Sequence, residues 1–324
     1  MKQTALDMVA KGKGILAADE SVGTMTKRLE AIKVESTLEN RNDFRHTILS
    51  TSGLGKHISG VILFDETLRN EEIMKAIEEQ GIIPGIKVDG GTKQHTTGCV
   101  GEKVTEGLDG LEKRLAEYHA LGARFAKWRA VLSPQATCRN IKANAVSLSL
   151  YAGACQAAGL VPIVEPEILM DGTHSVQESY RITKRVLHAV FDQLSCQQVA
   201  LDEMVLKPNM VLAGYDGDMA DPAIVAELTV AALLDTVPAS VPGIAFLSGG
   251  QSPDLSSNHL KLMNQLVVSW VPWNLTFSFG RALQQPALKE WGDKNGHERN
   301  SRVAATQTAL LIAAARNGKA TYGE

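Results

Sequence analysis

Two lysines of this sequence have surroundings that suit covalent chemistry on a carbonyl group. Lys207 follows the apolar residues Met204–Leu206 and precedes Pro208, and Lys127 lies within another apolar segment, 125–128. A lysine that is partly desolvated and crowded by other cations has a lowered pKa, so its amine is neutral at pH 7 and can form a Schiff base. We expect Lys207 to be the reactive lysine and keep Lys127 as the second candidate, because the sequence alone separates them only weakly.

Carboxylates that could serve as acid and base follow segments of the same kind. Glu165 and Glu167 come after Val161–Val164, and Asp19 ends the first apolar segment of the chain. Neighbouring carboxylates push each other's pKa values apart, which suits one proton donor and one acceptor. We therefore expect Glu165 and Glu167 to form an acid and base pair beside the amine.

Charged residues two positions apart recur in these segments. Lys87 and Asp89 form one such pair, and Lys127 and Arg129 form another. Strand side chains alternate between two faces, so both members of a pair point the same way. If those faces point inward, cations and carboxylates meet in one place, and burying them is favourable only if they pair or bind a charged molecule.

Two glycine-containing segments could hold a phosphate group. Ser248, Gly249 and Gly250 follow an apolar segment, and backbone N–H groups in such a turn can wrap an anion because glycine allows close approach. Gly280 and Arg281 repeat the arrangement after the last apolar segment and add the N–H donors of a guanidinium. A serine-glycine-glycine turn is often purely structural. The second segment is what makes a phosphate site the better interpretation.

Motifs for other cofactors fail on context. Gly12, Gly14 and Ala17 fit a dinucleotide-binding pattern, but they precede a predicted strand when that motif must follow one. Gly55-Lys56 lacks the remaining residues of a P-loop. The eight histidines show neither H-x-H nor H-E-x-x-H spacing, so we expect no metal site.

Eight short apolar segments position these residues, and a longer segment of helical period follows each. Strands buried on both faces give continuous apolar runs, and alternation with helices is typical of parallel strands. The eight segments are Ile15–Ala18, Val61–Phe64, Ile83–Val88, Phe125–Trp128, Val161–Val164, Met204–Leu206, Ile244–Leu247 and Trp273–Phe277.

This alternation predicts an α/β fold, a closed (β/α)8 TIM barrel, with an open doubly wound sheet as the alternative. Catalytic side chains then lie at the carboxyl ends of the strands. No Ser-, Gly- or Pro-rich linker divides the chain, so we expect residues 1–324 to form a single domain, with the first ~14 residues as an extra helix. Helices are predicted over 109–121, 140–158, 175–194, 221–234 and 301–316.

Composition limits the classes of function. Hydrophobic residues make up 44% and charged residues 21% of the 324 residues, which is typical of globular proteins. A formal charge of −3 gives no bulk attraction to nucleic acid or to an anionic membrane. The chain lacks the ~20-residue apolar stretch of a membrane span, a secretory leader and any C-x-x-C pair, so we expect a cytoplasmic protein with free thiols.

Taken together, these segments resemble the class I fructose-bisphosphate aldolases, the Schiff-base, metal-independent family. The resemblance extends in the family's order from residue 14 to residue 283. It is carried by Gly14–Ser21 (GILAADES), Gly60–Phe64 (GVILF), Glu66–Leu68 (ETL), Gly85–Asp89 (GIKVD), Phe125–Arg129 (FAKWR), Val161–Leu169 (VPIVEPEIL), Leu206–Val211 (LKPNMV), Phe246–Ser252 (FLSGGQS) and Gly280–Leu283 (GRAL).

The resemblance implies roles for individual residues. Lys207 matches the lysine that forms the imine with dihydroxyacetone phosphate, and Lys127 the lysine that assists the carbinolamine step. Glu165 matches the acid and base of that step, with Glu167 as its supporting carboxylate, and Asp19 matches the group that handles the C4 hydroxyl proton. One phosphate is assigned to Ser248, Gly249, Gly250, Ser278, Gly280 and Arg281, and the other to Ser21, Thr24, Arg28 and Lys87, with Arg129 also among the substrate-binding residues.

The implied activity is reversible cleavage of fructose 1,6-bisphosphate to dihydroxyacetone phosphate and glyceraldehyde 3-phosphate, a lyase reaction of glycolysis and gluconeogenesis. The resemblance also implies no cofactor and a homo-oligomer, a tetramer or a dimer. Animal members have a longer C-terminal tail ending in tyrosine, whereas this sequence ends Thr321-Tyr322-Gly323-Glu324, so the group that protonates the enamine is left open. Gly90 stands where those members usually have lysine, which suggests a microbial member.

Two other functions remain compatible with these residues. One is a Schiff-base aldolase on the same barrel that acts on a different phosphosugar. The other is a non-catalytic binding protein built on an aldolase scaffold, against which the presence of Lys207, Glu165 and Asp19 argues.

Overall fold

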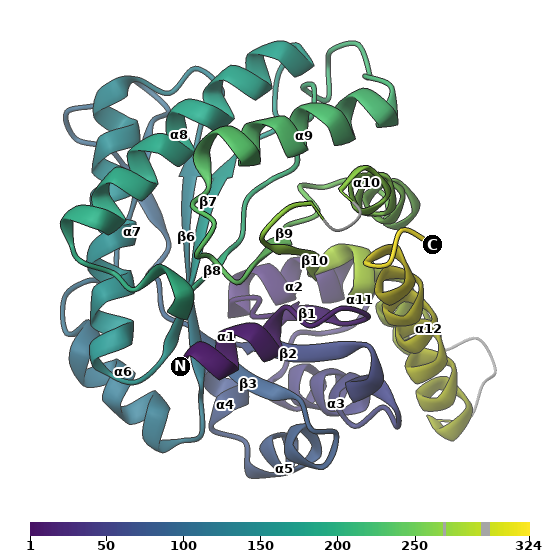
Figure 1. Cartoon of the computed structure of the whole chain (residues 1–324). Helices are drawn as coiled ribbons and strands as arrows, with labels where there is room; N and C mark the ends of the chain where they lie inside the picture. Colours follow the sequence, from purple (N-terminus) through teal and green to yellow (C-terminus); the bar gives the residue numbers. More distant parts are fainter. Residues whose placement is uncertain (268–269, 293–298) are drawn as a thin grey trace.

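Eight parallel strands form a closed barrel, in the order β1-β10-β9-β8-β7-β6-β3-β2 (Figure 1). The structure is a computed structural model that describes residues 1–267, 270–292 and 299–324. The barrel strands are β1 (Gly14–Ala18), β2 (Ile58–Leu63), β3 (Ile83–Lys87), β6 (Phe125–Leu132), β7 (Val161–Ile168), β8 (Val205–Leu206), β9 (Gly243–Phe246) and β10 (Asn274–Phe279). The closed barrel confirms the predicted fold class, and the open sheet is wrong.

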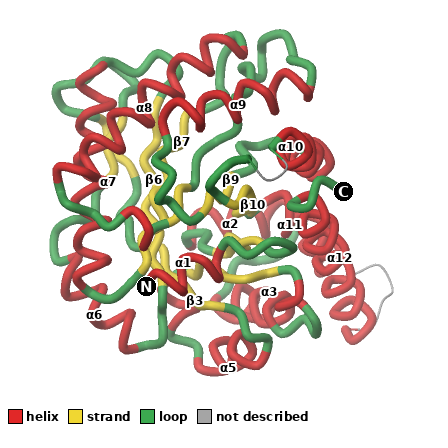
Figure 2. Tube along the Cα trace, in the orientation of Figure 1, coloured by secondary structure: helices red, strands yellow, loops and turns green. Residues whose placement is uncertain are grey.

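Helices surround the strands on the outside, as the red helices around the yellow strands in Figure 2 show. They are α1 (Lys2–Met8), α2 (Val22–Ala31), α3 (Leu38–Leu49), α4 (Asp65–Leu68), α5 (Glu71–Glu79), α6 (Leu111–Ala120), α7 (Cys138–Ala157), α8 (Val176–Cys196), α9 (Pro222–Thr236), α10 (Pro253–Leu266), α11 (Arg281–Gly292) and α12 (Arg299–Ala320), with 3-10 turns η1 (Leu54–Lys56) and η2 (Leu201–Glu203). The five helices expected from the sequence correspond to α6, α7, α8, α9 and α12, and each is present.

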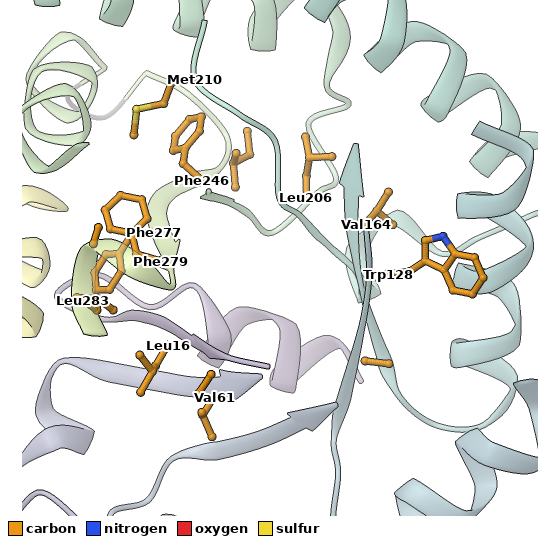
Figure 3. Packing of buried hydrophobic residues seen from close by; sticks show 14 of the residues in the cluster. Leu16, Val61, Trp128, Val164, Leu206, Met210, Phe246, Phe277, Phe279 and Leu283 are labelled. Carbon is orange, nitrogen blue, oxygen red and sulfur yellow. The ribbon is translucent and has the colours of Figure 1, made fainter. Parts of the chain in front are cut away.

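The alternation of side chains along the strands separates two apolar layers. One layer lies between the strands and the helices and contains Trp128, Val164 and Leu206, as Figure 3 shows. Leu16 of β1 and Phe246 of β9 belong to the same layer. Residues of the opposite parity point into the barrel. The same alternation therefore turns the residues next to these outward side chains toward the barrel axis.

The extra N-terminal helix α1 packs at the amino end of the barrel. Its residues Ala5 and Met8 belong to a buried cluster with Phe125 and Val161, which begin their strands, and with Ile15 near the start of β1. This apolar layer fills the amino end of the barrel, so the carboxyl end is the one available for polar side chains.

Two strands are longer than the apolar segments suggested. β6 and β7 pair over eight residues each, with Arg129 opposite Glu165 and Val131 opposite Glu167. The prediction that these charged residues follow the strand ends is therefore wrong, and Pro166 lies within β7 without ending it. The pairing of β6 with β7 extends both strands beyond the apolar run.

A short antiparallel hairpin of β4 (Thr92–Gln94) and β5 (Lys103–Thr105) was also missed, because most of its residues are polar and exposed.

Space inside the barrel is tight at Gly85, where a Cβ atom would lie 2.2 Å from the Phe125 ring. We expect Gly85→Ala to destabilise the fold by about 1–3 kcal/mol through overpacking. Gly153 in α7 is the matched control, because a Cβ there meets nothing within 4 Å. Gly153→Ala should be neutral or stabilising by up to ~1 kcal/mol. Urea unfolding of both variants measures this, and equal stabilities would contradict it.

Candidate functional site

A cavity of about 960 Å³ opens at the carboxyl ends of the strands. Every site residue predicted from the sequence lines it. These are Asp19, Ser21, Thr24, Arg28, Lys87, Lys127, Arg129, Glu165, Glu167, Lys207, Ser248, Gly249, Gly250, Ser278, Gly280 and Arg281. The structure thus brings together residues from seven of the eight barrel strands or from the segments that follow them, and the role of each remains a prediction.

Lys127 lies at the centre of the charged residues in this cavity. Its Nζ is 2.7 Å from Asp19 Oδ2, 3.5 Å from Glu165 Oε2 and 3.8 Å from Asp89 Oδ2. The lysine side chain is only 4% exposed, so its charge depends on these carboxylates for stabilisation. One cation on β6 therefore connects the residues after β1 and β3 with the middle of β7.

Lys207 contacts the same glutamate from the other side. Its Nζ is 3.3 Å from Glu165 Oε1, and both side chains are 5% exposed. The Lys207 N–H donates to the Val164 carbonyl at 2.8 Å, so the residue continues the pairing of β8 with β7 and points inward. Glu165 thereby bridges two lysines, one through each carboxylate oxygen. This arrangement allows a proton to pass between Glu165 and Lys207.

The pKa of Lys127 contradicts its alternative role as a neutral amine. Burial lowers this pKa, but the attraction of Asp19, Glu165 and Asp89 outweighs burial and raises it above its ordinary value. Carboxylates surround Lys127 where the sequence suggested a cluster of cations, so this lysine stays charged. Conversely, burial raises the pKa of Asp19, but the cations Lys127, Lys207 and Lys87 lower it to about 2.

Glu165 and Glu167 share a face of β7, yet each has its own cation. Arg129 Nε donates to Glu167 Oε2, across the β6–β7 pair. Burial lowers the pKa of Arg129, but the Glu167 carboxylate more than offsets this and raises it. Glu167 is thus bound to Arg129, whereas Glu165 lies between the two lysines; that the two glutamates form an acid and base pair stays a prediction.

The glycine turn after β9 has the features of an anion site. Gly249 and Gly250 have φ angles of 55° and 80°, in the region that favours glycine. Within the described ranges, neither of their N–H groups donates to a protein acceptor. Ser278 Oγ, on neighbouring β10, is buried without a hydrogen-bond partner among the described residues. Helix α11 begins at Arg281, so its N-terminus adds a partial positive charge beside these donors.

A second group of polar residues lies on another part of the cavity lining. Ser21 caps α2 by accepting from the Thr24 N–H at 3.4 Å. Arg28, further along α2, pairs with Glu20 at 2.5 Å, and Lys87 Nζ lies 2.6 Å from an oxygen of Asp89. The site thus has cationic groups on β3 and α2 as well as beside β10, which suits a ligand with two anionic ends.

Sequence reasoning missed Tyr215, whose side chain lines the cavity from the loop between β8 and α9. This loop has neither an apolar run nor a spacing that indicates a function.

Within the described ranges, no group of three or more His, Cys, Asp or Glu residues could hold a metal ion. No helix in those ranges is long and apolar enough to span a membrane.

All or nearly all of the chain matches proteins that are already known. A family model described as fructose-bisphosphate aldolase class-I matches residues 1–324. A probable fructose-bisphosphate aldolase class 1 of Xylella fastidiosa is 47% identical over 335 residues, which cover 100% of this chain and 98% of that protein. Fructose-bisphosphate aldolase, cytoplasmic isozyme 2, of Pisum sativum is 49% identical over 321 residues, covering 96% and 88%.

A solved structure is also similar throughout. It is the fructose-bisphosphate aldolase of Plasmodium falciparum, in complex with TRAP and a small-molecule inhibitor. The TM-score is 0.95 at 46% identity, and the match covers 99% of this chain and 94% of that one.

The lowered pKa of Asp19 predicts how stability depends on pH. Its pKa falls from 3.8 to about 2 on folding, so its ionised form adds stability above pH 3.8 that is lost as the pH falls through about 2. The free energy of unfolding of wild type minus that of Asp19→Asn should be constant above pH 5 and should decrease below pH ~4. Urea unfolding at several pH values measures it. A difference that grows on acidification would show that the carboxylate is not stabilised in its charged form.

Proposed function

The chain belongs to the class I fructose-bisphosphate aldolase family, and from that premise we propose that it cleaves fructose 1,6-bisphosphate reversibly through a Schiff base on Lys207. The products are dihydroxyacetone phosphate and glyceraldehyde 3-phosphate. The observation that carries the proposal is the position of Lys207 Nζ, 3.3 Å from Glu165 in the cavity at the carboxyl ends of the strands.

Imine formation uses the bridge that Glu165 makes between the two lysines. Glu165 accepts a proton from the Lys207 ammonium, and the neutral amine that results attacks the ketone carbon. The carbinolamine that forms must then lose its hydroxyl as water. Glu165 can give that hydroxyl a proton, since its carboxyl group lies within reach of Lys207. Lys127 stays cationic on the other oxygen of Glu165, at 3.5 Å, and stabilises the negative charge left there.

Carbon–carbon cleavage requires a base and an electron sink. Asp19 is the base: it accepts the C4 hydroxyl proton as the C3–C4 bond breaks and the aldehyde forms. The electron pair of that bond moves to the protonated imine on Lys207, which becomes an enamine. Asp19 is ionised at neutral pH, with a pKa of about 2, and Lys127 at 2.7 Å positions it. Protonation of the enamine and hydrolysis of the imine then release dihydroxyacetone phosphate.

Binding a phosphate at each end orients the scissile bond over Lys207. The turn at Gly249 and Gly250, with Arg281, would hold the phosphate nearer the ketone, and Arg28 would hold the other. Fixing the substrate in this way can contribute about 7–11 kcal/mol to lowering the barrier. The two anionic ends also explain why cations occur on both sides of the cavity.

Several properties come with the same proposal. The family is metal-independent in general, and we propose that this protein uses no metal or other cofactor. The pea relative is named a cytoplasmic isozyme, which supports a cytoplasmic location here. We also propose that residues 1–324 act as one domain and that the protein is a homo-oligomer, a dimer or a tetramer.

Borohydride reduction tests the reactive lysine. In the presence of dihydroxyacetone phosphate it should trap a covalent adduct on Lys207, and Lys207→Met should be inactive and untrapped, because no imine can form. Lys113→Met, at an exposed position on α6, is the control and should keep full activity. Peptide mass spectrometry locates the adduct, and an adduct on Lys127 would refute the assignment.

A chelator tests the proposed absence of a metal. EDTA should leave the wild-type rate of fructose 1,6-bisphosphate cleavage unchanged, and a strong loss of activity would point to a metal-dependent aldolase.

Arg28 tests the second phosphate. Arg28→Ala should raise KM for fructose 1,6-bisphosphate on the order of 10-fold, the effect of losing a charge-assisted hydrogen bond, and should leave KM for fructose 1-phosphate unchanged. Arg185→Ala on α8, where the arginine is exposed, is the control. Steady-state kinetics on both sugars decide, since equal losses would place Arg28 outside a site for the second phosphate.

A further inference from the structure

Tyr215 lies directly over the glycine turn of the cavity. Its hydroxyl donates to the Gly249 carbonyl. A Cβ atom placed on Gly250 would be 2.2 Å from the Tyr215 hydroxyl oxygen and 3.1 Å from a guanidinium nitrogen of Arg281. The phenol and the guanidinium therefore flank the same small volume above Gly250.

The loop that carries Tyr215 is attached to the segment after β7 by its backbone. Gly214 N–H donates to the His174 carbonyl at 2.8 Å, and Tyr215 N–H donates to the Met170 carbonyl at 2.9 Å. Asp216 N–H donates to the Gly172 carbonyl at 3.0 Å. These bonds fix the start of the Tyr215 side chain relative to the strand of Glu165. The placement of the phenol over the turn is thus built into the fold.

The side chain is also accessible to a ligand. Tyr215 is 56% exposed and lines the cavity. Burial of its ring raises the pKa of the phenol, although Arg281 acts in the opposite direction, so the group is a neutral O–H at physiological pH. A hydroxyl hydrogen rotates about the C–O bond, and its direction adapts to the acceptor that is present. Tyr215 can therefore redirect its hydrogen from the Gly249 carbonyl to an anionic oxygen without moving its ring.

We propose that Tyr215 is a specificity-determining residue whose hydroxyl donates a hydrogen bond to the phosphate next to the substrate ketone. This rests on the proposed function of the site. The hydroxyl adds a neutral donor to the backbone N–H groups of the turn and to the cation of Arg281. The hydroxyl thereby adds to a preference for phosphorylated over unphosphorylated ketones, because a phosphate oxygen is the acceptor of this hydrogen bond.

The first experiment compares two ketones that differ only in the phosphate. Borohydride trapping on Lys207 is measured against the concentration of dihydroxyacetone phosphate and of dihydroxyacetone. Tyr215→Phe should raise the half-saturating concentration of dihydroxyacetone phosphate on the order of 10-fold and leave that of dihydroxyacetone unchanged. Tyr322→Phe is the control, since Tyr322 is 57% exposed and lies against Gly12, away from the cavity. Equal increases for both ketones, or no increase for the phosphate ester, would overturn the proposal.

A second experiment keeps the proposal testable if Lys207 proves not to be the reactive amine. Calorimetry measures the binding of dihydroxyacetone phosphate to Lys207→Met and to Lys207→Met/Tyr215→Phe, in which no imine forms at this position. A loss of affinity of about 10-fold in the double variant supports the proposal, and unchanged affinity refutes it. Absence of trapping in wild type would instead refute the proposed function alone.

The third readout separates contact with the ligand from support of the turn. Hydrogen–deuterium exchange of residues 246–252 is compared between ligand-free wild type and Tyr215→Phe. Equal exchange is expected, because the turn also has its own bond from Gln251 N–H to the Ser248 carbonyl at 3.1 Å. Faster exchange in the variant would assign Tyr215 to holding the turn and overturn its role as a phosphate ligand.

Discussion

The position of Glu165 between two buried lysines is the interaction on which the rest of the site depends. Ionised groups are costly to bury unless each is paired, and this carboxylate pairs with Lys207 and Lys127 at once. Lys127 in turn compensates Asp19 and Asp89. Removing any one member leaves an uncompensated charge in the barrel, so the chain of contacts acts as a unit. The proposed chemistry needs this unit, because it transfers protons between groups that otherwise would stay in fixed charge states.

The barrel supports this cluster by dividing its interior into two parts. At the amino end, Phe125, Val161 and the helix α1 fill the space with apolar side chains. At the carboxyl end the same inward positions of the strands carry Lys127 and Glu165. Closure of the barrel keeps these positions at fixed distances, whereas loops alone would allow them to separate. A rigid arrangement of this kind lowers the cost of reorganisation during the reaction.

The groups proposed to bind the phosphates lie around the charged centre and would use a different kind of interaction. The turn at Gly249 and Gly250 offers backbone N–H groups, and the start of α11 adds a helix terminus. These donors cost little to leave exposed to water, so they need no partners within the protein. Tyr215 reaches this turn from a loop that follows another strand, and the proposed phosphate site would therefore combine groups from three successive loops of the barrel.

Local patterns in the sequence were sufficient for the fold and, together with the family resemblance, for many of the site residues, although not for Tyr215. Continuous apolar segments predicted all eight barrel strands, and every site residue that these segments or the family resemblance named lines the cavity. The sequence therefore determined which residues could take part, because the strand period and the order of strands and helices are local properties.

Only the tertiary structure decided how those residues pair. Asp19, Lys127 and Glu165 are far apart in the chain, and nothing local indicates that Lys127 is surrounded by carboxylates and has a raised pKa. The partner of Glu167 depends on the register of β6 with β7. The position of Tyr215 depends on backbone bonds between two loops. Charge state and contact are set by distances in space of a few ångströms, and those distances exist only once the barrel has closed.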